Sequence, residues 1–195
     1  MNTEVRKFLR ELEEYGRAHD ARQPDRSRKV SNLHPDTAEI VSMLARSSGA
    51  KRVLEIGTSN GYSTIWLAAS VAPADGSVIS IDRSREKQKL ARENLLKAGL
   101  LKYVDLRCGD ASEVVATLSG PFDFVFFDAD RIGAHKQLAL ILPMLAPPAF
   151  LLSDNALSPP GELAEYLTMV KGLKQFQHVV IPVGKGLSVA FTGPS

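Results

Sequence analysis

The stretch that decides the fold is R-V-L-E-I-G-T-S-N-G-Y-S, residues 52–63. Its first part is a short apolar run of the kind that forms a buried parallel strand. Gly57 and Gly61 bracket a tight turn, and residues 62–71 predict a helix that Pro73 ends. Strand, glycine turn and helix in this order are the opening unit of a Rossmann-like nucleotide-binding sheet.

The turn departs from the glycine pattern of a dinucleotide site. That pattern, G-x-G-x-x-G, lets a pyrophosphate rest on the N-terminus of the helix. Here Ser59 and Tyr62 stand at the second and third glycine positions, and Glu55 precedes the turn. Because a carboxylate would repel phosphates, the turn favours a ligand with a cationic end. S-adenosylmethionine, which has an ammonium and a sulfonium but no phosphate, fits this description; an ordinary structural turn is the alternative.

The composition of the chain is that of a globular protein. Its 195 residues are 44% hydrophobic and 24% charged, which fits a single domain, and a net charge of +2 gives no global attraction to nucleic acid or membranes. Cys108 is the single cysteine, so an internal disulfide cannot form. The N-terminus lacks an apolar signal core, and no run is long enough to span a bilayer. We expect a soluble, cytoplasmic protein.

The first 34 residues are predicted to be an N-terminal helix and arm, followed by one domain over residues 35–195. Apolar residues recur at helical spacing over residues 3–16. Residues 17–34 are polar and carry five basic residues against two acidic ones. Two interpretations of residues 17–34 stand open: a solvated linker, or a mobile arm that covers the site or meets an anionic substrate.

Strand-like and helix-like segments alternate through the rest of the chain. The fold prediction is therefore α/β: a Rossmann-like, seven-stranded, mostly parallel sheet with an antiparallel C-terminal hairpin and helices on both faces. The short link P-V-G-K-G makes the last two strands a hairpin. The predicted strands are residues 53–56, 77–81, 103–107, 122–127, 149–152, 176–181 and 187–191, and the predicted helices after the arm are residues 35–48, 62–71, 84–98, 112–118, 134–145 and 161–172.

An acidic residue stands at or near the end of most of the predicted strands. In an open parallel sheet, ligands bind beyond the carboxyl ends of the strands. Asp82 stands where an acidic residue receives ribose hydroxyls in nucleotide sites, and Asp110 with Ala111 is placed to flank the adenine. Each acid alone also fits a helix N-cap, which for Asp110 means capping a helix that begins near Ser112. The five strand-end acids are Glu55, Asp82, Asp110, Asp128 and Asp154.

Asp128, Asp154 and Asn155 form a second set after the fourth and fifth strands. Two carboxylates and an amide offer only oxygen ligands, which suit a hard divalent cation and suit Zn²⁺ poorly. Since these strands can be neighbours, the three side chains can converge on one ion. The sequence predicts Mg²⁺ here, with Ca²⁺ or Mn²⁺ as alternatives. Two helix caps and a turn asparagine are the structural alternative.

Six motifs taken together resemble the cation-dependent O-methyltransferases, the catechol and caffeoyl-CoA O-methyltransferase-like enzymes. The motifs follow the family's order at similar spacing over residues ~30–191. They are E-I-G-T-S-N-G-Y-S (55–63), S-I-D (80–82), G-D-A (109–111), F-F-D-A-D (126–130), S-D-N (153–155) and I-P-V-G-K-G-L (181–187).

The resemblance implies transfer of a methyl group from S-adenosylmethionine to a hydroxyl of a small acceptor, such as a vicinal diol or an aromatic compound. Asp128, Asp154 and Asn155 would ligate the divalent cation, and Asp128 would also lie near the substrate. The resemblance further implies a homodimer. The residues assigned to the cofactor are Glu55, Gly57, Thr58, Ser59, Ser63, Asp82, Arg83, Asp110, Ala111, Asp128 and Asp130.

One departure from the family pattern affects the chemistry. The family usually has D-A-D-K-x-x-Y after the fourth strand, whereas this chain has Arg131 at the lysine position and Ala134 at the tyrosine position. Arginine cannot be deprotonated in a protein, so it cannot act as a general base. We assign Asp128 and Arg131 to catalysis, with three arrangements open. The cation alone acidifies the hydroxyl, His135 or Lys136 replaces the lysine, or the substrate is already anionic and Arg131 pairs with it.

Three other functions compete with this one. A tRNA hydroxyuridine O-methyltransferase is the nearest, because the basic arm could contact phosphates. A non-catalytic S-adenosylmethionine-binding protein is the second, because the family lysine is absent. An NAD-dependent oxidoreductase is disfavoured by the missing glycines and by Glu55. We expect a small hydroxylated acceptor and no membrane partner, with tRNA as the alternative acceptor.

Overall fold

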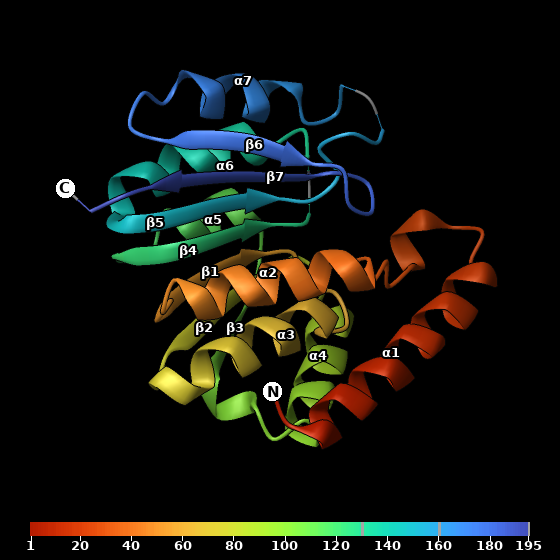
Figure 1. The fold of residues 1–195 in the computed structure, drawn as a ribbon. Coiled ribbons are helices and arrows are strands. Elements are labelled where there is room, and N and C mark those ends of the chain that lie inside the picture. The colour runs from red at the N-terminus through yellow and green to blue at the C-terminus, as the bar shows by residue number, and fades with distance from the viewer. Residues whose placement is uncertain (130, 160, 195) are drawn as a thin grey trace.

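The computed structural model describes residues 1–129, 131–159 and 161–194 (Figure 1). The strands are β1 Arg52–Ile56, β2 Ser77–Asp82, β3 Val104–Cys108, β4 Phe122–Phe127, β5 Leu145–Ser153, β6 Gln177–Ile181 and β7 Leu187–Thr192. They form one seven-stranded sheet in the order β3-β2-β1-β4-β5-β7-β6. The pairings of β1 to β5 are parallel, and β7 runs antiparallel to both β5 and β6. The predicted fold, including the C-terminal hairpin, is confirmed.

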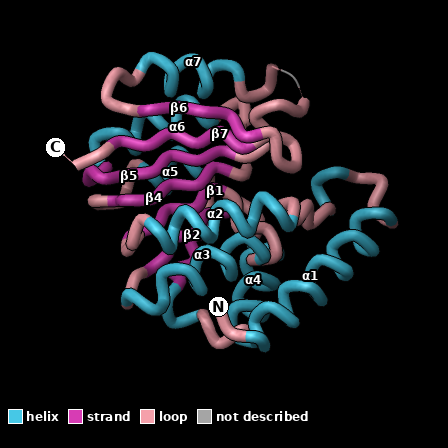
Figure 2. Tube along the Cα trace, in the orientation of Figure 1, coloured by secondary structure: helices cyan, strands magenta, loops and turns pink. Residues whose placement is uncertain are grey.

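Helices cover both faces of the sheet, as Figure 2 shows. One hydrophobic cluster packs α1 to α4 against one face, and a second cluster packs α5 to α7 against the other. None of the helices in the described ranges combines the length and hydrophobicity that a bilayer span requires. The helices are α1 Thr3–Ala21, α2 Pro35–Ser47, α3 Tyr62–Val71, α4 Arg85–Lys97, α5 Ala111–Val115, α6 Ala134–Ile141 and α7 Ala164–Gly172.

Strand β1 is the centre of the sheet, because it pairs with both β2 and β4. Its apolar residues Val53, Leu54 and Ile56 are at most 1% exposed, as expected for a strand covered on both faces. The chain winds outward from β1 to β2 and β3 on one side and to β4 and β5 on the other. The carboxyl ends of β1 and β4 therefore flank the point where the winding reverses, which is where open sheets of this kind bind ligands.

The N-terminal helix is longer than predicted and packs onto the domain. The periodic stretch at residues 3–16 continues to Ala21, and Val5, Leu9 and Leu12 join the cluster that also holds α2 and α3. Gly16 therefore lies inside the helix, where glycine is normally unfavourable. Glycine is needed here because the segment after α1 passes close to the helix: a Cβ at residue 16 would lie 2.5 Å from the side-chain Nδ2 of Asn32.

The segment after α1 is packed at its end, whereas most of its described residues before Val30 are exposed. Val30 and Leu33 are each only 4% exposed. Asn32 donates its side-chain N–H to the carbonyl of Leu12 at 2.9 Å. The solvated-linker interpretation of residues 17–34 is therefore wrong for these residues, since they lie against α1 and the sheet.

Several element boundaries differ from the prediction, including helix α6, which ends at Ile141 instead of residue 145, and helix α7, which begins at Ala164 instead of residue 161. Strand β5 begins at Leu145 rather than at residue 149, because Leu145 pairs with Phe122 before the register shifts between Phe122 and Phe124. Helix α5 ends at Val115, three residues earlier than predicted.

The turn after β1 requires glycine at residue 57 for two reasons. The backbone of Gly57 has φ +111°, a conformation that side chains rarely adopt. A Cβ at this position would also collide with the carbonyl group of Asp128, lying 2.7 Å from the carbonyl carbon. The close approach brings the β1 turn against the end of β4.

We predict that Gly57→Ala lowers the free energy of unfolding by roughly 2–3 kcal/mol, because the variant combines backbone strain with a collision. Gly172→Ala is the matched control, since a methyl group there meets no atom within 4 Å and the residue ends a helix. Urea unfolding of both variants measures the difference. Equal stability of the two variants would contradict the prediction.

Candidate functional site

A large cleft opens at the carboxyl ends of the parallel strands. Its volume is about 2270 Å³, which exceeds the several hundred Å³ that a single small ligand needs. One wall carries the strand ends of β1, β2, β4 and β5, and the opposite wall carries residues of the N-terminal arm. The cleft therefore has room for a nucleoside cofactor and a second molecule side by side.

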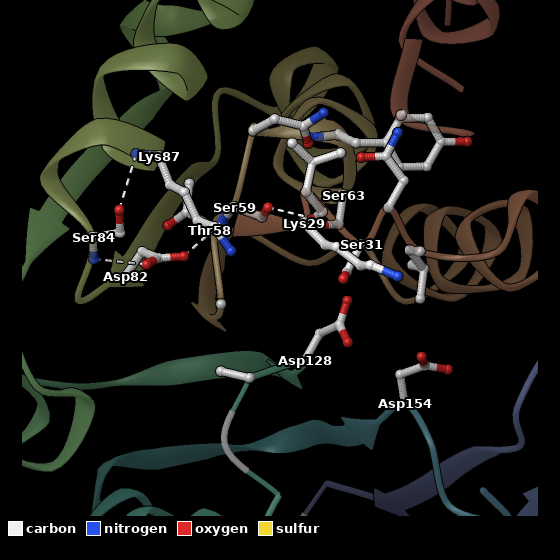
Figure 3. Close-up of a pocket in the computed structure, with 18 of the residues that line it drawn as sticks. Lys29, Ser31, Thr58, Ser59, Ser63, Asp82, Ser84, Lys87, Asp128 and Asp154 are labelled. Carbon is white, nitrogen blue, oxygen red and sulfur yellow. Dashed lines mark hydrogen bonds between the residues drawn. The ribbon is translucent and has the colours of Figure 1, made fainter. Parts of the chain in front are cut away.

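Backbone hydrogen bonds hold Asp128 and Asp154 at the same edge of the sheet. The N–H of Asp128 donates to the carbonyl of Ile56 at 2.8 Å, and the N–H of Asp154 donates to the carbonyl of Phe127 at 3.0 Å. Each acid thus follows its strand by one residue and remains tied to the neighbouring strand. Figure 3 shows Asp128 and Asp154 at the cleft, with Lys29 and Ser31 across from them.

Asp82 both faces the cleft and holds the β1 turn. Its carboxylate accepts the N–H of Ser59 at 2.8 Å and the N–H of Ser84 at 2.9 Å (Figure 3). Ser59 has φ +47°, so this bond fixes a turn residue in the left-handed region. Ser84 in turn caps α4 by accepting the N–H of Lys87, as predicted. The carboxylate therefore sits between the turn and the start of α4, the place expected to receive a ribose.

Glu55 has a different position from the one predicted. The residue is 0% exposed and lies beneath the turn, outside the set of residues that line the cleft. Its Oε2 accepts the hydroxyls of Thr64 and Ser80, each at 2.5 Å. Burial raises the pKa of Glu55 to about 7, partly offset by hydroxyls that include Ser63. Glu55 thus supports the turn from below, and its predicted contact with the cofactor stays a prediction.

A polar network that the sequence did not reveal extends from Glu55 under the turn. The Thr58 and Ser80 hydroxyls lie 2.6 Å apart, and Gln88 Nε2 donates to Thr58 Oγ1 at 3.0 Å. Gln88 also donates to the carbonyl of Arg107 at 3.0 Å, which ties α4 to β3. The turn is therefore held by a buried side-chain network on one side and by Asp82 on the other.

Most of the other predicted cofactor residues do line the cleft. Asp110 accepts the N–H groups of Ser112 and Glu113, so its interpretation as the N-cap of α5 is confirmed, and it also borders the cleft. Asp130 lies outside the described residues. The predicted cofactor residues that line the cleft are Gly57, Thr58, Ser59, Ser63, Asp82, Arg83, Asp110, Ala111 and Asp128.

The predicted cation ligands do come together. Asp154 and Asn155 are each 7% exposed, and Asn155 Nδ2 donates to Asp154 Oδ2 at 2.8 Å. Asp154 Oδ1 is buried and has no hydrogen-bond partner among the described residues. Burial raises the pKa of Asp128 well above its usual value, and the Asp154 charge raises it further. Burial also raises the pKa of Asp154.

One half-buried carboxylate, Asp128, and one buried carboxylate with an unpartnered oxygen, Asp154, repel each other and fit a hard cation. In the parts of the chain that the structure describes, no site gathers three or more His, Cys, Asp or Glu side chains for a metal. The set would instead offer two carboxylates and the side-chain amide of Asn155, which is held beside Asp154 by its own Nδ2. All of these donors are oxygen atoms, as Mg²⁺ prefers.

Arg131 is engaged by the protein itself. Its side chain is 16% exposed, and its guanidinium forms an ion pair with Glu162. His135 lies 2.9 Å from Glu165, and neither His135 nor Lys136 is among the described residues that line the cleft. The arrangement in which His135 or Lys136 replaces the lysine therefore loses its geometric basis, whereas Arg131 lines the cleft and its pairing with an anionic substrate stays a prediction. Glu162 was not anticipated, because nothing in the local sequence shows which residue will face Arg131.

The N-terminal arm is attached to the cofactor turn. Ser59 Oγ donates to the carbonyl of Val30 at 2.5 Å, and the Asp20 carboxylate accepts the N–H groups of Val30 and Ser31 at 2.8 Å. Tyr62 donates its hydroxyl to Glu13 of α1 at 2.5 Å. These contacts favour the interpretation of the arm as a cover for the site.

We predict that Glu55→Gln changes how stability depends on pH. In the unfolded chain Glu55 ionises near its ordinary pKa of 4.5, but in the folded protein it keeps its proton up to about pH 7. Between these values the unfolded state has lost a proton that the folded state keeps, so the free energy of unfolding falls as pH rises.

Between pH 4.5 and about pH 7 the free energy of unfolding should fall by on the order of 3 kcal/mol because of Glu55. Glu55→Gln removes this fall, because glutamine does not ionise. Urea unfolding of wild type and variant at pH 5 and pH 8 measures it. Glu93→Gln, at an exposed position on α4, is the matched control. A pH-independent difference between wild type and Glu55→Gln would contradict the prediction.

Comparison with known proteins agrees with this geometry. A family model described as O-methyltransferase matches residues 3–190. A catechol O-methyltransferase of Niastella koreensis is 31% identical over 151 residues, covering 74% of this chain and 68% of that protein. A catechol O-methyltransferase of Mycobacterium tuberculosis is 37% identical over 128 residues, covering 65% of this chain and 58% of that protein. The chain thus matches about six-tenths to two-thirds of these relatives' lengths.

Among solved structures, the O-methyltransferase TomG of Streptomyces achromogenes, in complex with SAM, has a TM-score of 0.79. It is 27% identical to this chain, and the match covers 99% of this chain and 91% of that one. The family model matches nearly the whole chain, so the assignment does not depend on a single relative. The chain therefore belongs to the O-methyltransferase family, within the class I S-adenosylmethionine-dependent enzymes that its motifs resemble.

Proposed function

We propose that this protein transfers the methyl group of S-adenosylmethionine to one hydroxyl of a small vicinal diol, such as a catechol, with the help of a divalent cation. The observation that carries the proposal is the carboxylate pair of half-buried Asp128 and buried Asp154, set in the same cleft as the cofactor turn. The relatives named catechol O-methyltransferase support this choice of acceptor. The cytoplasmic location and the homodimer stay predictions.

The cofactor half of the proposal depends on the β1 turn. S-adenosylmethionine would supply an electrophilic methyl group on a sulfonium. Gly57 allows the backbone to approach the ligand, and Asp82 offers its remaining lone pairs to ribose hydroxyls. Ala111 and the capping residue Asp110 border the cleft beyond Asp82, where the base would lie.

The acceptor half depends on the ends of β4 and β5. Asp128, Asp154 and Asn155 would hold the cation, which when bound supplies a Lewis acid that lowers the pKa of an acceptor hydroxyl. The same residues fix where a diol can sit relative to the cofactor turn, which reduces the entropy cost of aligning the two reactants. Arg131 and Glu162 line the same side of the cleft as an ion pair, so they shape the acceptor space without supplying a base.

We predict that Asp82→Ala weakens binding of S-adenosylhomocysteine at least about tenfold, because it removes both a ribose acceptor and a support of the turn. Asp105→Ala is the matched control, since Asp105 is an exposed acid on the next strand. Isothermal titration calorimetry measures both affinities, with thermal unfolding to confirm that each variant is folded. An unchanged affinity in Asp82→Ala would sink the cofactor assignment.

We predict that Asp154→Ala abolishes Mn²⁺ binding, detected by electron paramagnetic resonance, and abolishes methylation of catechol. The affinity for S-adenosylhomocysteine should stay within about threefold, since Asp154 belongs to the acceptor half. Asp36→Ala, which removes an exposed acid at the start of α2, is the matched control. Full activity of the wild type in excess chelator would remove the cation from the proposal.

A further inference from the structure

The turn between β6 and β7, residues 182–186, is fixed beside the end of β5. The N–H of Leu157 donates to the carbonyl of Lys185 at 2.9 Å, and the N–H of Ala156 donates to the carbonyl of Gly186 at 2.8 Å. Both donors belong to the loop that directly follows the predicted cation ligands. The backbone of Lys185 is therefore held next to the carboxylate pair by main-chain hydrogen bonds.

Two glycines seat this turn against its neighbours. Gly184 has φ +55°, and a Cβ there would lie 2.7 Å from Thr37 Oγ1 and 2.9 Å from His34 Cβ. Gly186 has φ +90°, and a Cβ there would lie 2.5 Å from Leu157 Cγ. Lys185, between the two glycines, lines the cleft. The turn is thus built to bring one lysine to the acceptor side.

The charges around the carboxylate pair come from several elements. Arg131 from the end of β4, Lys185 from the β6–β7 turn and His34 from the start of α2 all lower the pKa of Asp154. Arg131 and Lys185 also lower that of Asp128. Arg131 is neutralised by Glu162, whereas Lys185 has no ion pair within 4 Å among the described residues. The positive charge of Lys185 is therefore available to a ligand in the cleft.

We propose that Lys185 is a catalytic residue that binds the ionised hydroxyl oxygen of the acceptor. This inference rests on the proposed function and assigns to the β6–β7 turn the ammonium group that the family pattern would place at residue 131. The Lys185 ammonium donates a hydrogen bond to the oxyanion.

The balance of the reaction is that of a simple displacement. The acceptor hydroxyl releases its proton to water, and its oxygen, held by the Lys185 ammonium, forms the new bond to the methyl carbon. The bond between that carbon and sulfur breaks, and its electron pair goes to sulfur, so the sulfonium becomes a neutral thioether. Lys185 therefore has to stabilise negative charge before transfer, which an ammonium does in a partly closed cleft.

The test uses 4-nitrocatechol, whose ionised form absorbs at longer wavelength than its neutral form. The probe is titrated with pH while bound to the full-length protein with S-adenosylhomocysteine and Mg²⁺. In Lys185→Met we expect the apparent pKa of the bound probe to rise by about one unit, equivalent to about tenfold weaker binding of the ionised form. Lys185→Arg should retain most of the wild-type value, because it keeps the charge.

Lys174→Met is the matched control. Lys174 is exposed, precedes β6 at the end of the strand opposite to the turn, and lies outside the cleft lining. Lys174→Met should leave the apparent pKa of the bound probe unchanged. The acid limb of the pH profile of kcat/KM for catechol methylation should shift in Lys185→Met and stay in place in Lys174→Met.

The outcomes separate the inference from the function on which it rests. If wild type binds and methylates the probe but Lys185→Met has the same spectrum and affinity, the role of Lys185 is overturned and the proposed function stands. If wild type, shown to bind S-adenosylhomocysteine and Mg²⁺, neither binds nor methylates the probe, both are overturned. Thermal unfolding confirms that each variant is folded, and a shift in Lys185→Met that Lys185→Arg largely restores supports the inference.

Discussion

The close approach of the β1 turn to the end of β4 is the constraint on which both halves of the cleft depend. No side chain fits at residue 57, because the carbonyl group of Asp128 occupies that space. The N–H of Asp128 also donates to the carbonyl of Ile56, the last residue of β1, so a main-chain hydrogen bond holds the two strand ends together. As a result, the β1 turn, which should receive the cofactor, lies directly beside Asp128, whose carboxylate should face the acceptor.

This proximity has an electrostatic cost. Glu55 and Asp154 are buried and Asp128 is half-buried. The charges of Glu55 and Asp154 each raise the pKa of Asp128. The protein offsets the cost differently at each acid. Glu55 is surrounded by hydroxyl donors, which can hydrogen-bond either protonation state. The other two face the cleft, where Arg131, Lys185 and a bound cation can balance them.

The sequence predicted what is local and missed what is set by packing. The strand–turn–helix unit, the Ser84 and Asp110 caps and the hairpin follow from short-range patterns, and all are present. Glu55 shows the limit of such patterns. A strand alternates its side chains between two faces, but the sequence does not say whether an acid at the strand end faces the ligand or lies beneath the turn.

The missed partners are all distant in the chain. Arg131 forms an ion pair with Glu162, which lies 31 residues further on and which none of the three arrangements for the lysine position includes. The arm was expected to be either solvated or functional, and the deciding contact joins Val30 to Ser59 across 29 residues. In each case the competing partner comes from another element, so only the assembled fold can decide which contact forms.

The position of Lys185 shows how the hairpin could take part in the site although it is the one part of the sheet with antiparallel pairing. A parallel strand delivers its following residue to the cleft and then leaves through a helix. The β6–β7 turn instead reaches the same end of the sheet and returns at once, so it can be held on both sides by Leu157 and by the start of α2. A short turn held in this way keeps a flexible lysine in place more tightly than a long loop could, since fewer backbone dihedrals are free.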